Sequence, residues 1–265
     1  MSRASRPTDT IRRITVPVDG RVPTGATNAY VVAGKLLIDP AGRTDDLDAA
    51  VAAADVDHIA VTHAHPDHVG GVAAYAAETG ATVWCRRGFE SRFAAAAGID
   101  PDRTFVEGTR LPVGDGVGVI DAQGHAPDHV AFAAADGTVC GDVAVADGSV
   151  AVAAPDGDLR GYLVALRRLY ARNPPALLPG HGPAITDPRA TCLRLLRHRR
   201  DRDRRVVAEV RAGAPDVDAV LDAAYDKDVS GVRALARATV VAHLEKLDVE
   251  GRVAFDPEAG TVAPA

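Results

Sequence analysis

The segment 59–71 constrains the fold of this chain more than any other, because it places a cluster of ligand-type side chains where an apolar strand ends. Four such residues fall within six positions: His63, His65, Asp67 and His68. The apolar run 59–61 precedes them, and Gly70-Gly71 opens an Ala-rich segment typical of a helix. Side chains alternate along a strand, so the first two imidazoles point to one side, and the turn brings the other two ligands to a neighbouring position. The pattern predicts a metal site on a strand-to-helix turn.

Three further candidate ligands follow downstream, each just after a short apolar run that predicts a strand. Each is preceded by glycine, which lets the backbone turn sharply beside an ion: His125, Asp142 and His181. The whole set combines imidazoles with carboxylates and contains no thiolate. Such a set is typical of Zn²⁺ held for chemistry, and Mn²⁺ or Fe would also fit.

In this order, the motifs H-x-H-x-D-H, G-H, G-D and G-H-G resemble those of the metallo-β-lactamase superfamily of hydrolases. The resemblance covers about the first 190 residues. It implies two divalent metal ions and divides the seven candidates between them. One ion is held by His63, His65 and His125, the other by Asp67, His68 and His181, and Asp142 bridges both.

Two cations that share a water lower its pKa to about 7, so a bridging hydroxide is available at neutral pH. Asp142 would hold the two-ion geometry, and Asp67 or a terminal water would relay a proton. Asp67 and Asp142 are therefore the candidate catalytic residues. The expected function is a binuclear metal-dependent hydrolase that directs this hydroxide at an ester, thioester or phosphodiester. The substrate is then a small-molecule ester or thioester, or RNA, and the sequence does not decide between them.

The other histidines carry less information. His129 matches the second histidine of the G-H-x-x-x-H motif, and it is expected either beside the ligands, facing substrate, or on the surface. No motif surrounds His58, His198 and His243, which are expected at the surface or as hydrogen-bonded core residues.

The first part of the chain, 1–186, is predicted to be an α+β catalytic domain. Short strands and helices alternate up to residue 97: a hairpin at 26–32 and 36–39, a helix at 45–54, a strand at 57–61 and helices at 72–79 and 89–97. Closely spaced β segments follow from 105 to 145, and then a helix at 158–171 with an apolar stripe. The superfamily resemblance implies that these elements form an αββα sandwich.

The remaining part, 187–265, is predicted to be a small winged-helix-like domain of three helices and a hairpin. Asp187-Pro188 starts the first helix, because aspartate caps a helix and proline suits its first turn. Helical spacing continues at 217–224 and 240–247, and a hairpin at 252–255 and 260–262 follows Gly251. This part also resembles the C-terminal domain of the β-lactamase-like protein 2 family, in which single-stranded RNA cleavage is described for some members.

The segment 189–205 is strongly basic. It contains eight arginines and two aspartates, a formal charge of +6 in a chain whose net charge is −6. Clustered arginines can neutralise the phosphates of a nucleic acid. Alternatively, they form a solvated helix face that pairs with acids on the catalytic domain, and the sequence leaves both alternatives open.

Composition indicates an ordinary globular protein, with 47% hydrophobic and 25% charged residues. No apolar run approaches the 18–20 residues, roughly, that a membrane span needs, so no membrane partner is expected. The segment 1–6 has no apolar stretch behind it, and three cysteines fit a reducing compartment, so a cytoplasmic location is expected. The oligomeric state stays open, with a homodimer as one alternative.

Two other functions compete with a general hydrolase. One is a single-stranded RNA endonuclease of the β-lactamase-like protein 2 type. The other is a nucleic-acid-binding regulator with a vestigial metal site. All seven ligand positions are filled, which argues against a vestigial site.

Overall fold

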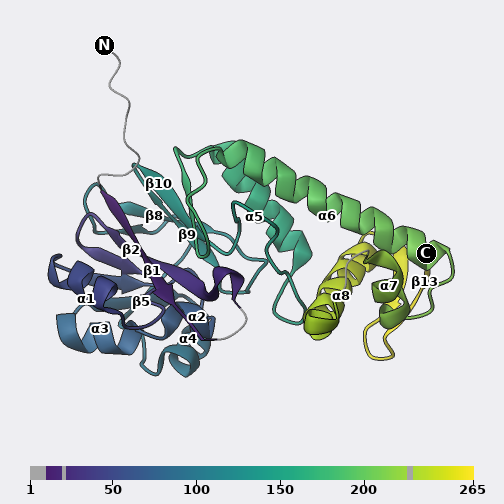
Figure 1. Cartoon of the computed structure of the whole chain (residues 1–265), viewed down its shortest axis with the longest axis horizontal. Coiled ribbons are helices and arrows are strands. Elements are labelled where there is room, and N and C mark those ends of the chain that lie inside the picture. The colour runs from purple at the N-terminus through teal and green to yellow at the C-terminus, as the bar shows by residue number, and fades with distance from the viewer. Residues whose placement is uncertain (1–9, 20–21, 226–228) are drawn as a thin grey trace, which may run out of the picture.

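Two β-sheets lie face to face in the computed structural model, which describes residues 10–19, 22–225 and 229–265 (Figure 1). The N-terminal segment 1–6, on which the expected cytoplasmic location partly depends, lies outside the described residues. The first sheet follows chain order: β1 (Ile11–Pro17), β2 (Ala26–Val32), β3 (Leu36–Ile38), β4 (His58–Ala60), β5 (Thr82–Arg86) and β6 (Arg103–Phe105). Strands β1 to β3 run antiparallel, and β3 to β6 run parallel.

The predicted hairpin at 26–32 and 36–39 is confirmed by the antiparallel pairing of β2 with β3. Its turn places Ala33 and Gly34 at φ values of 50° and 64°. Positive φ at both central residues is the turn geometry whose twist matches that of the flanking strands.

The second sheet has the order β11 (Leu177–Pro179), β10 (Gly137–Gly141), β9 (Val130–Ala134), β8 (Val117–Asp121) and β7 (Arg110–Leu111). Only the β10–β11 pair among these strands is parallel. The closely spaced β segments predicted between 105 and 145 are confirmed. Strands β4, β8, β10 and β11 all end beside the candidate ligands, so the two sheets together position the site.

Helices cover the outer faces of both sheets. Strand β2 shows why: Tyr30 and Val32 pack in the core between the sheets, whereas Ala29 and Val31 pack against the outer helices. Every second residue reaches the opposite face of a strand, so both faces are apolar and both must be covered. The first sheet is covered by α1 (Asp45–Ala52), α3 (Val72–Thr79) and α4 (Glu90–Ala97).

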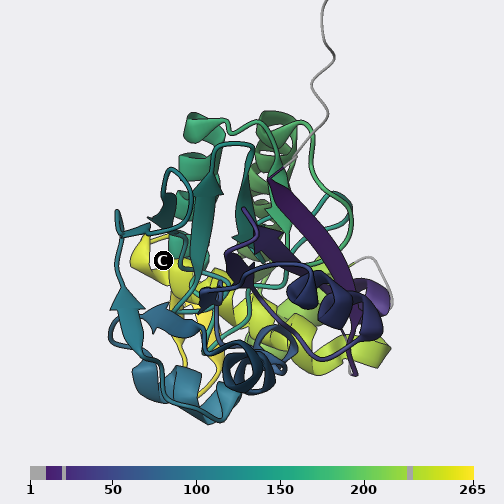
Figure 2. The ribbon, with the colours of Figure 1, turned by 90° about the vertical axis from the view of Figure 1, so that its left-hand side faces the viewer.

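The outer face of the second sheet is covered by α5 (Leu159–Arg172) and the start of α6 (Pro188–Arg211). Figure 2 shows the strands between these two helical layers. The predicted α+β fold with an αββα sandwich is therefore confirmed.

Helix α6 joins the sandwich to the C-terminal elements (Figure 1). Asp187 caps it by accepting a hydrogen bond from the backbone N–H of Ala190, as predicted. With 24 residues it is about 36 Å long. Cys192 and Leu195 pack in the core of the second sheet, whereas Val206 and Val210 pack in a separate C-terminal core.

The C-terminal core is completed by α7 (Val217–Ala224), α8 (Arg233–Val249) and the hairpin of β12 (Val253–Asp256) with β13 (Thr261–Pro264). The predicted helices and hairpin are confirmed as elements. Their assignment to a winged-helix domain and the domain boundary at 186/187 stay predictions. No helix within the described residues has the length and apolarity needed to cross a membrane.

Candidate metal centre

The turn between β4 and the short helix α2 (Pro66–Val69) carries the first four candidate ligands. Two hydrogen bonds donated by its backbone N–H groups fix its shape. Ala64 N–H donates to the Asp128 carboxylate over 2.7 Å, and Gly71 N–H donates to the Pro40 carbonyl over 2.7 Å. A Cβ on Gly71 would lie 2.8 Å from the same carbonyl oxygen, so the turn approaches the 40–42 loop too closely for a side chain.

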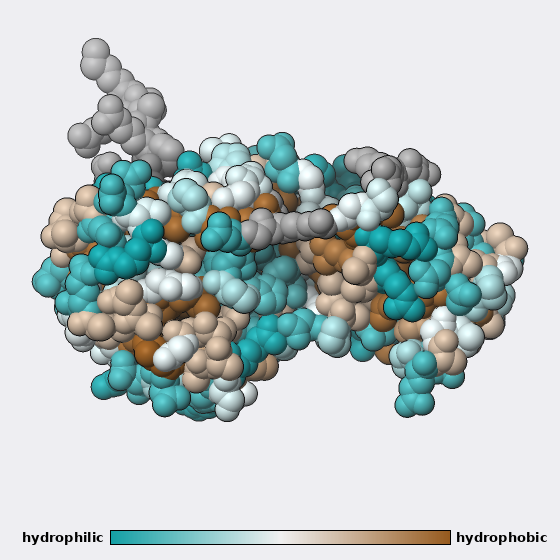
Figure 3. All heavy atoms as spheres, turned by 60° about the horizontal axis from the view of Figure 1, so that its bottom comes forward, coloured by the Kyte–Doolittle hydropathy of each residue, from teal (hydrophilic) through white to brown (hydrophobic). Residues whose placement is uncertain are grey.

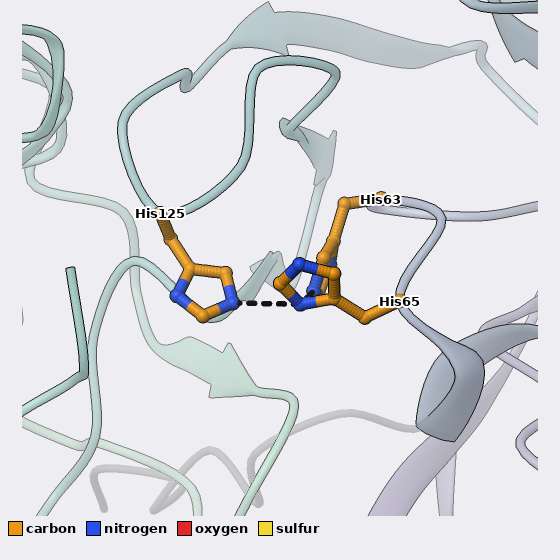
Figure 4. A group of neighbouring side chains, drawn as sticks. All are labelled: His63, His65 and His125. Atoms are coloured by element: carbon orange, nitrogen blue, oxygen red, sulfur yellow. Dashed lines mark hydrogen bonds between the residues drawn. The ribbon is translucent and has the colours of Figure 1, made fainter. Parts of the chain in front are cut away.

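The first group of ligand atoms consists of three imidazole nitrogens that converge on one point (Figure 4). His65 Nδ1 lies 2.9 Å from His63 Nε2 and 3.1 Å from His125 Nε2. His63 and His65 come from the turn after β4, and His125 comes from the loop after β8, on the other sheet. Three nitrogens at this spacing match one face of a tetrahedral site.

Among the described residues, two further groups lie beside the first, each with ligand atoms within 4.8 Å of one another: Asp67, His68 and His181, and His63, His68 and Asp142. Asp142 lies between the groups. Its Oδ2 is 3.3 Å from His181 Nε2 and 3.7 Å from His125 Nε2, and its Oδ1 is 3.8 Å from His68 Nε2. The structure thus brings together all seven residues selected from the sequence.

The outward nitrogen of each candidate imidazole faces an acceptor. His125 Nδ1 donates to the Ala151 carbonyl over 2.7 Å, and His181 Nδ1 donates to the Ala26 carbonyl over 2.8 Å. His65 Nε2 lies 3.8 Å from the Asp156 carboxylate. A proton held on the outward nitrogen leaves the inward nitrogen with its lone pair, which is the tautomer that binds a metal.

Asp39 performs the same task for His63 and His68. Its Oδ2 accepts hydrogen bonds from His68 Nδ1 over 2.9 Å and from the Thr62 hydroxyl over 2.8 Å. The Thr62 oxygen lies 3.1 Å from His63 Nδ1, so one fully buried carboxylate orients two imidazoles. The sequence pattern gives Asp39 no role beyond its place at the end of the predicted hairpin strand 36–39. Its position at the end of β3, the neighbour of β4, is the signal that could have identified it.

His129 lies behind the candidate ligands and is fully buried, so the surface alternative is excluded. Its Nε2 accepts a hydrogen bond from Asp142 N–H over 2.9 Å, and its ring stacks on His63 with centroids 4.8 Å apart. Gly141 makes this possible: its φ is 46°, and a Cβ there would lie 2.7 Å from His129 Nε2. His129 therefore positions the backbone that carries Asp142.

The electrostatics of the site favour neutral imidazoles near His65 and cationic charge near Asp142. Burial and the neighbouring imidazoles hold the pKa of His63 well below its ordinary value, and they lower that of His65 to about 4. Burial alone would lower the pKa of His181, but the carboxylates of Asp142 and Asp67 raise it to about 10. Burial alone would raise the pKa of Asp142, but the hydrogen bond with His181 and the neighbouring His68 and His125 hold it below the usual range.

The donor set fits first-row divalent ions. Among the described residues, the buried atoms His68 Nε2 and Asp142 Oδ1 have no hydrogen-bond partner, although both point into the site. Burying such atoms without a partner is unfavourable, and a metal ion would satisfy both. A Cβ on Gly180 would lie 2.7 Å from the His68 ring, so the backbone there leaves space only for the ligands.

The site opens into a cavity of about 740 Å³. Five candidate ligands line its floor: His65, Asp67, His125, Asp142 and His181. Its walls come from the segment 145–151, from Gly182-Pro183, and from Val232 and Leu235 of the C-terminal part. A small-molecule substrate of ordinary size fits this volume.

The histidines without a motif lie outside the three groups, as expected. His58 accepts a hydrogen bond from Trp84 Nε1 over 3.3 Å. His243 is fully buried and donates from Nδ1 to Asp203 over 2.7 Å. His198 is half-buried on α6.

The arginines of α6 do not form one uniform face. Arg194 donates to the backbone carbonyls of Val145 and Ala146, and the buried Arg199 donates to that of Val150. These contacts brace the segment 145–151 against α6. The partners here are carbonyls of the catalytic part rather than the acids that one alternative expected.

Comparison with known proteins agrees with this geometry. A model of the metallo-beta-lactamase superfamily matches residues 22–181, a range that contains all seven candidate ligands. The chain belongs to the metallo-beta-lactamase superfamily. The family assignment made from the motifs is thus confirmed.

Among curated relatives, this superfamily member is 27% identical to a beta-lactamase-like protein 2 homolog of Drosophila melanogaster, over 78% of this chain and 73% of the relative. It is 37% identical to a hydroxyacylglutathione hydrolase of Rhodospirillum rubrum, over 40% of this chain and 41% of that protein. A beta-lactamase domain protein from Burkholderia ambifaria shares the fold, with a TM-score of 0.80 at 19% identity, over 98% of this chain and 94% of the other.

Proposed function

We propose that this metallo-beta-lactamase superfamily protein is a binuclear metal-dependent hydrolase whose substrate is a thioester. The observation that carries the proposal is the convergence of seven ligand atoms whose imidazoles are each oriented by an acceptor on the far side of the ring. One ion would be held by His63, His65 and His125, and the other by Asp67, His68 and His181. Asp142 would bridge them.

When bound, divalent ions at these groups supply an acidified water and neutralise charge on the carbonyl oxygen of the substrate. The protein's own side chains position the ligands and transfer the proton of the attacking water. Asp142 is held between the two groups by the hydrogen bond to His129. Asp67 borders the cavity and lies 3.4 Å from His181, where its carboxylate could accept a proton from the attacking water and pass it to the leaving thiolate.

The thioester class is supported by the relative from Rhodospirillum rubrum, whose name describes hydrolysis of a hydroxyacylglutathione. The stretch compared spans less than half of that protein, so the acyl group and the thiol stay open. We propose Zn²⁺ as the resident ion, because imidazoles dominate the donor set. We also propose residues 187–265 as the winged-helix-like unit.

The test is thiol release from a panel of thioesters by protein loaded with Zn²⁺, Mn²⁺ or Fe²⁺, with the metal content measured in parallel. His65→Ala should lose both turnover and one metal equivalent without loss of folded structure. His58→Ala is the matched control, because His58 lies seven residues earlier and outside the ligand groups.

Three results would overturn the proposal. Wild-type turnover by folded His65→Ala would remove the metal centre from the mechanism. Cleavage of a single-stranded RNA oligonucleotide without hydrolysis of any thioester would favour the endonuclease alternative. A protein that binds none of the three metals would favour the vestigial-site alternative.

A further inference from the structure

A second cavity, of about 670 Å³, adjoins the metal cavity and shares one wall with it. Five of the described residues line both cavities: Ser149, Val150, Ala151, Val232 and Leu235. The metal ligands border only the first cavity. Figure 3 shows a recess between the larger and smaller parts of the molecule, with hydrophilic and hydrophobic surface side by side around it. A substrate longer than the metal cavity could therefore continue into the second one.

The α6 wall of the second cavity is basic: His198, Arg199, Arg202 and Arg205 line it. Among the described lining residues, Asp201 is the acid on this wall, and it is paired with Arg204 over 2.7 Å. Burial and the guanidinium groups of Arg199 and Arg202 lower the pKa of His198 to about 4. Three guanidinium groups around a neutral imidazole make this wall attractive to an anion.

The part of the lining that comes from residues 229–236 is apolar. Val232 and Leu235 are 44% and 47% exposed, and Val229 and Ala236 extend the same part of the lining. A ligand with a charged end and a less polar arm would suit this lining, since the arm would cover these side chains while the charged end reaches the arginines.

The wall that separates the cavities is physically tied to the metal centre. The Ala151 carbonyl accepts the hydrogen bond from His125 Nδ1, and the neighbouring Val150 carbonyl accepts one from Arg199. A group bound beside Arg199 therefore lies one short segment of backbone away from a candidate metal ligand.

We propose that this second cavity binds the phosphate-bearing thiol portion of a thioester whose acyl carbon lies at the metal centre. The proposal rests on the thioester hydrolase function above and specifies the class of leaving group. Guanidinium groups form paired hydrogen bonds to phosphate oxygens, and the cluster carries more charge than a single carboxylate would need. The guanidinium carbon of Arg202 lies 3.7 Å from the centroid of the Tyr225 ring. This stacking already orders the Arg202 side chain, so binding would require little further ordering of it.

The experiment compares two thioesters that share one acyl group, on protein loaded with metal. One is the acyl-coenzyme A, whose thiol carries phosphates, and the other is the uncharged N-acetylcysteamine thioester. Arg205→Gln and the double variant Arg202→Gln/Arg205→Gln are measured against Arg197→Gln and Arg200→Gln. The control arginines are exposed on α6 and line neither cavity.

In the variants that lack Arg205, we expect kcat/KM for the acyl-coenzyme A to fall at least tenfold relative to kcat/KM for the N-acetylcysteamine thioester. The change should come chiefly from a higher KM for the acyl-coenzyme A. The control variants should keep the wild-type ratio. An unchanged ratio in folded Arg205→Gln and in the double variant would overturn the proposal. Thermal melting shows whether each variant is folded. If the double variant is not, the result for Arg205→Gln alone decides the outcome.

Binding separates this proposal from the proposed hydrolase function. Calorimetry with adenosine 3′,5′-bisphosphate, which has no thioester, measures the cavity without turnover. Binding that Arg205→Gln weakens at least tenfold would support the site even if no thioester is hydrolysed. Absence of binding by the wild-type protein would overturn it. Arg205-dependent binding of a single-stranded RNA oligonucleotide, with none of the bisphosphate, would also overturn the small-molecule site.

Discussion

Replacing Asp39 with asparagine should weaken metal binding more than any other change outside the seven candidate ligands. Asp39 is fully buried and has a φ of 52°. Asparagine tolerates this backbone conformation and has nearly the same shape, so the variant tests hydrogen bonding rather than packing. The Asp39 Oδ2 atom accepts from two donors, His68 Nδ1 and the Thr62 hydroxyl.

With an amide in place of the carboxylate, one of its two terminal atoms becomes a donor. If the amide nitrogen takes the Oδ2 position, His68 must accept at Nδ1 and carry its proton on Nε2, the atom that faces the metal. Loss of such an outer partner typically lowers metal affinity by about 10–100-fold, or about 1.4–2.7 kcal/mol. The ion on Asp67, His68 and His181 should be affected most, because His68 contacts Asp39 directly and His63 does so only through Thr62.

The assay is competition with a chromogenic chelator, combined with elemental analysis, on folded Asp39→Asn and wild-type protein. Asp203→Asn is the matched control. Asp203 is also a buried carboxylate that bonds an imidazole, that of His243, but it lies in the C-terminal core. Asp203→Asn should reduce stability and leave both metal affinities unchanged. Affinities within twofold of wild type for both ions in folded Asp39→Asn would refute the argument.

Three further outcomes are expected. Gly124→Ala should destabilise the protein by at least about 1–3 kcal/mol in chemical denaturation, because φ is +135° there and a Cβ would overlap the Tyr162 backbone; wild-type stability would contradict this. Stability should fall as pH decreases from about 6.5 to below 4. Burial lowers the pKa of His243 in the folded protein. At Asp203, the hydrogen bonds from His243 and Lys246 outweigh burial and also lower the pKa. The unfolded chain therefore binds more protons than the folded protein throughout this range. His243→Gln should flatten the upper part of that pH profile of thermal melting. Removing metal with a chelator should lower the melting temperature, since an ion at 100 times its Kd contributes about 2.7 kcal/mol to stability; an unchanged melting temperature would argue against a resident metal.

The residues that carry the chemistry could be predicted from the sequence, because the decisive information is local. The cluster at 63–68 and the glycine-flanked His125, Asp142 and His181 occupy strand ends that apolar runs already indicate. Helix starts are local too, since an aspartate cap acts on a backbone N–H three residues away, as at Asp187. Side-chain periodicity therefore predicted nearly all of the elements.

Only the tertiary structure decided what lies behind and beside the ligands. Asp39 bonds His68 across 29 residues, and Arg199 bonds the carbonyl of Val150 across 49. The second cavity arises where α6, the segment 149–151 and Val232-Leu235 meet. Such contacts depend on strand order and on how helices pack across sheets, which propensity and periodicity do not encode. The ligands are local in sequence, whereas the groups that orient them, and those proposed to select the substrate, come together only when the sheets and α6 pack.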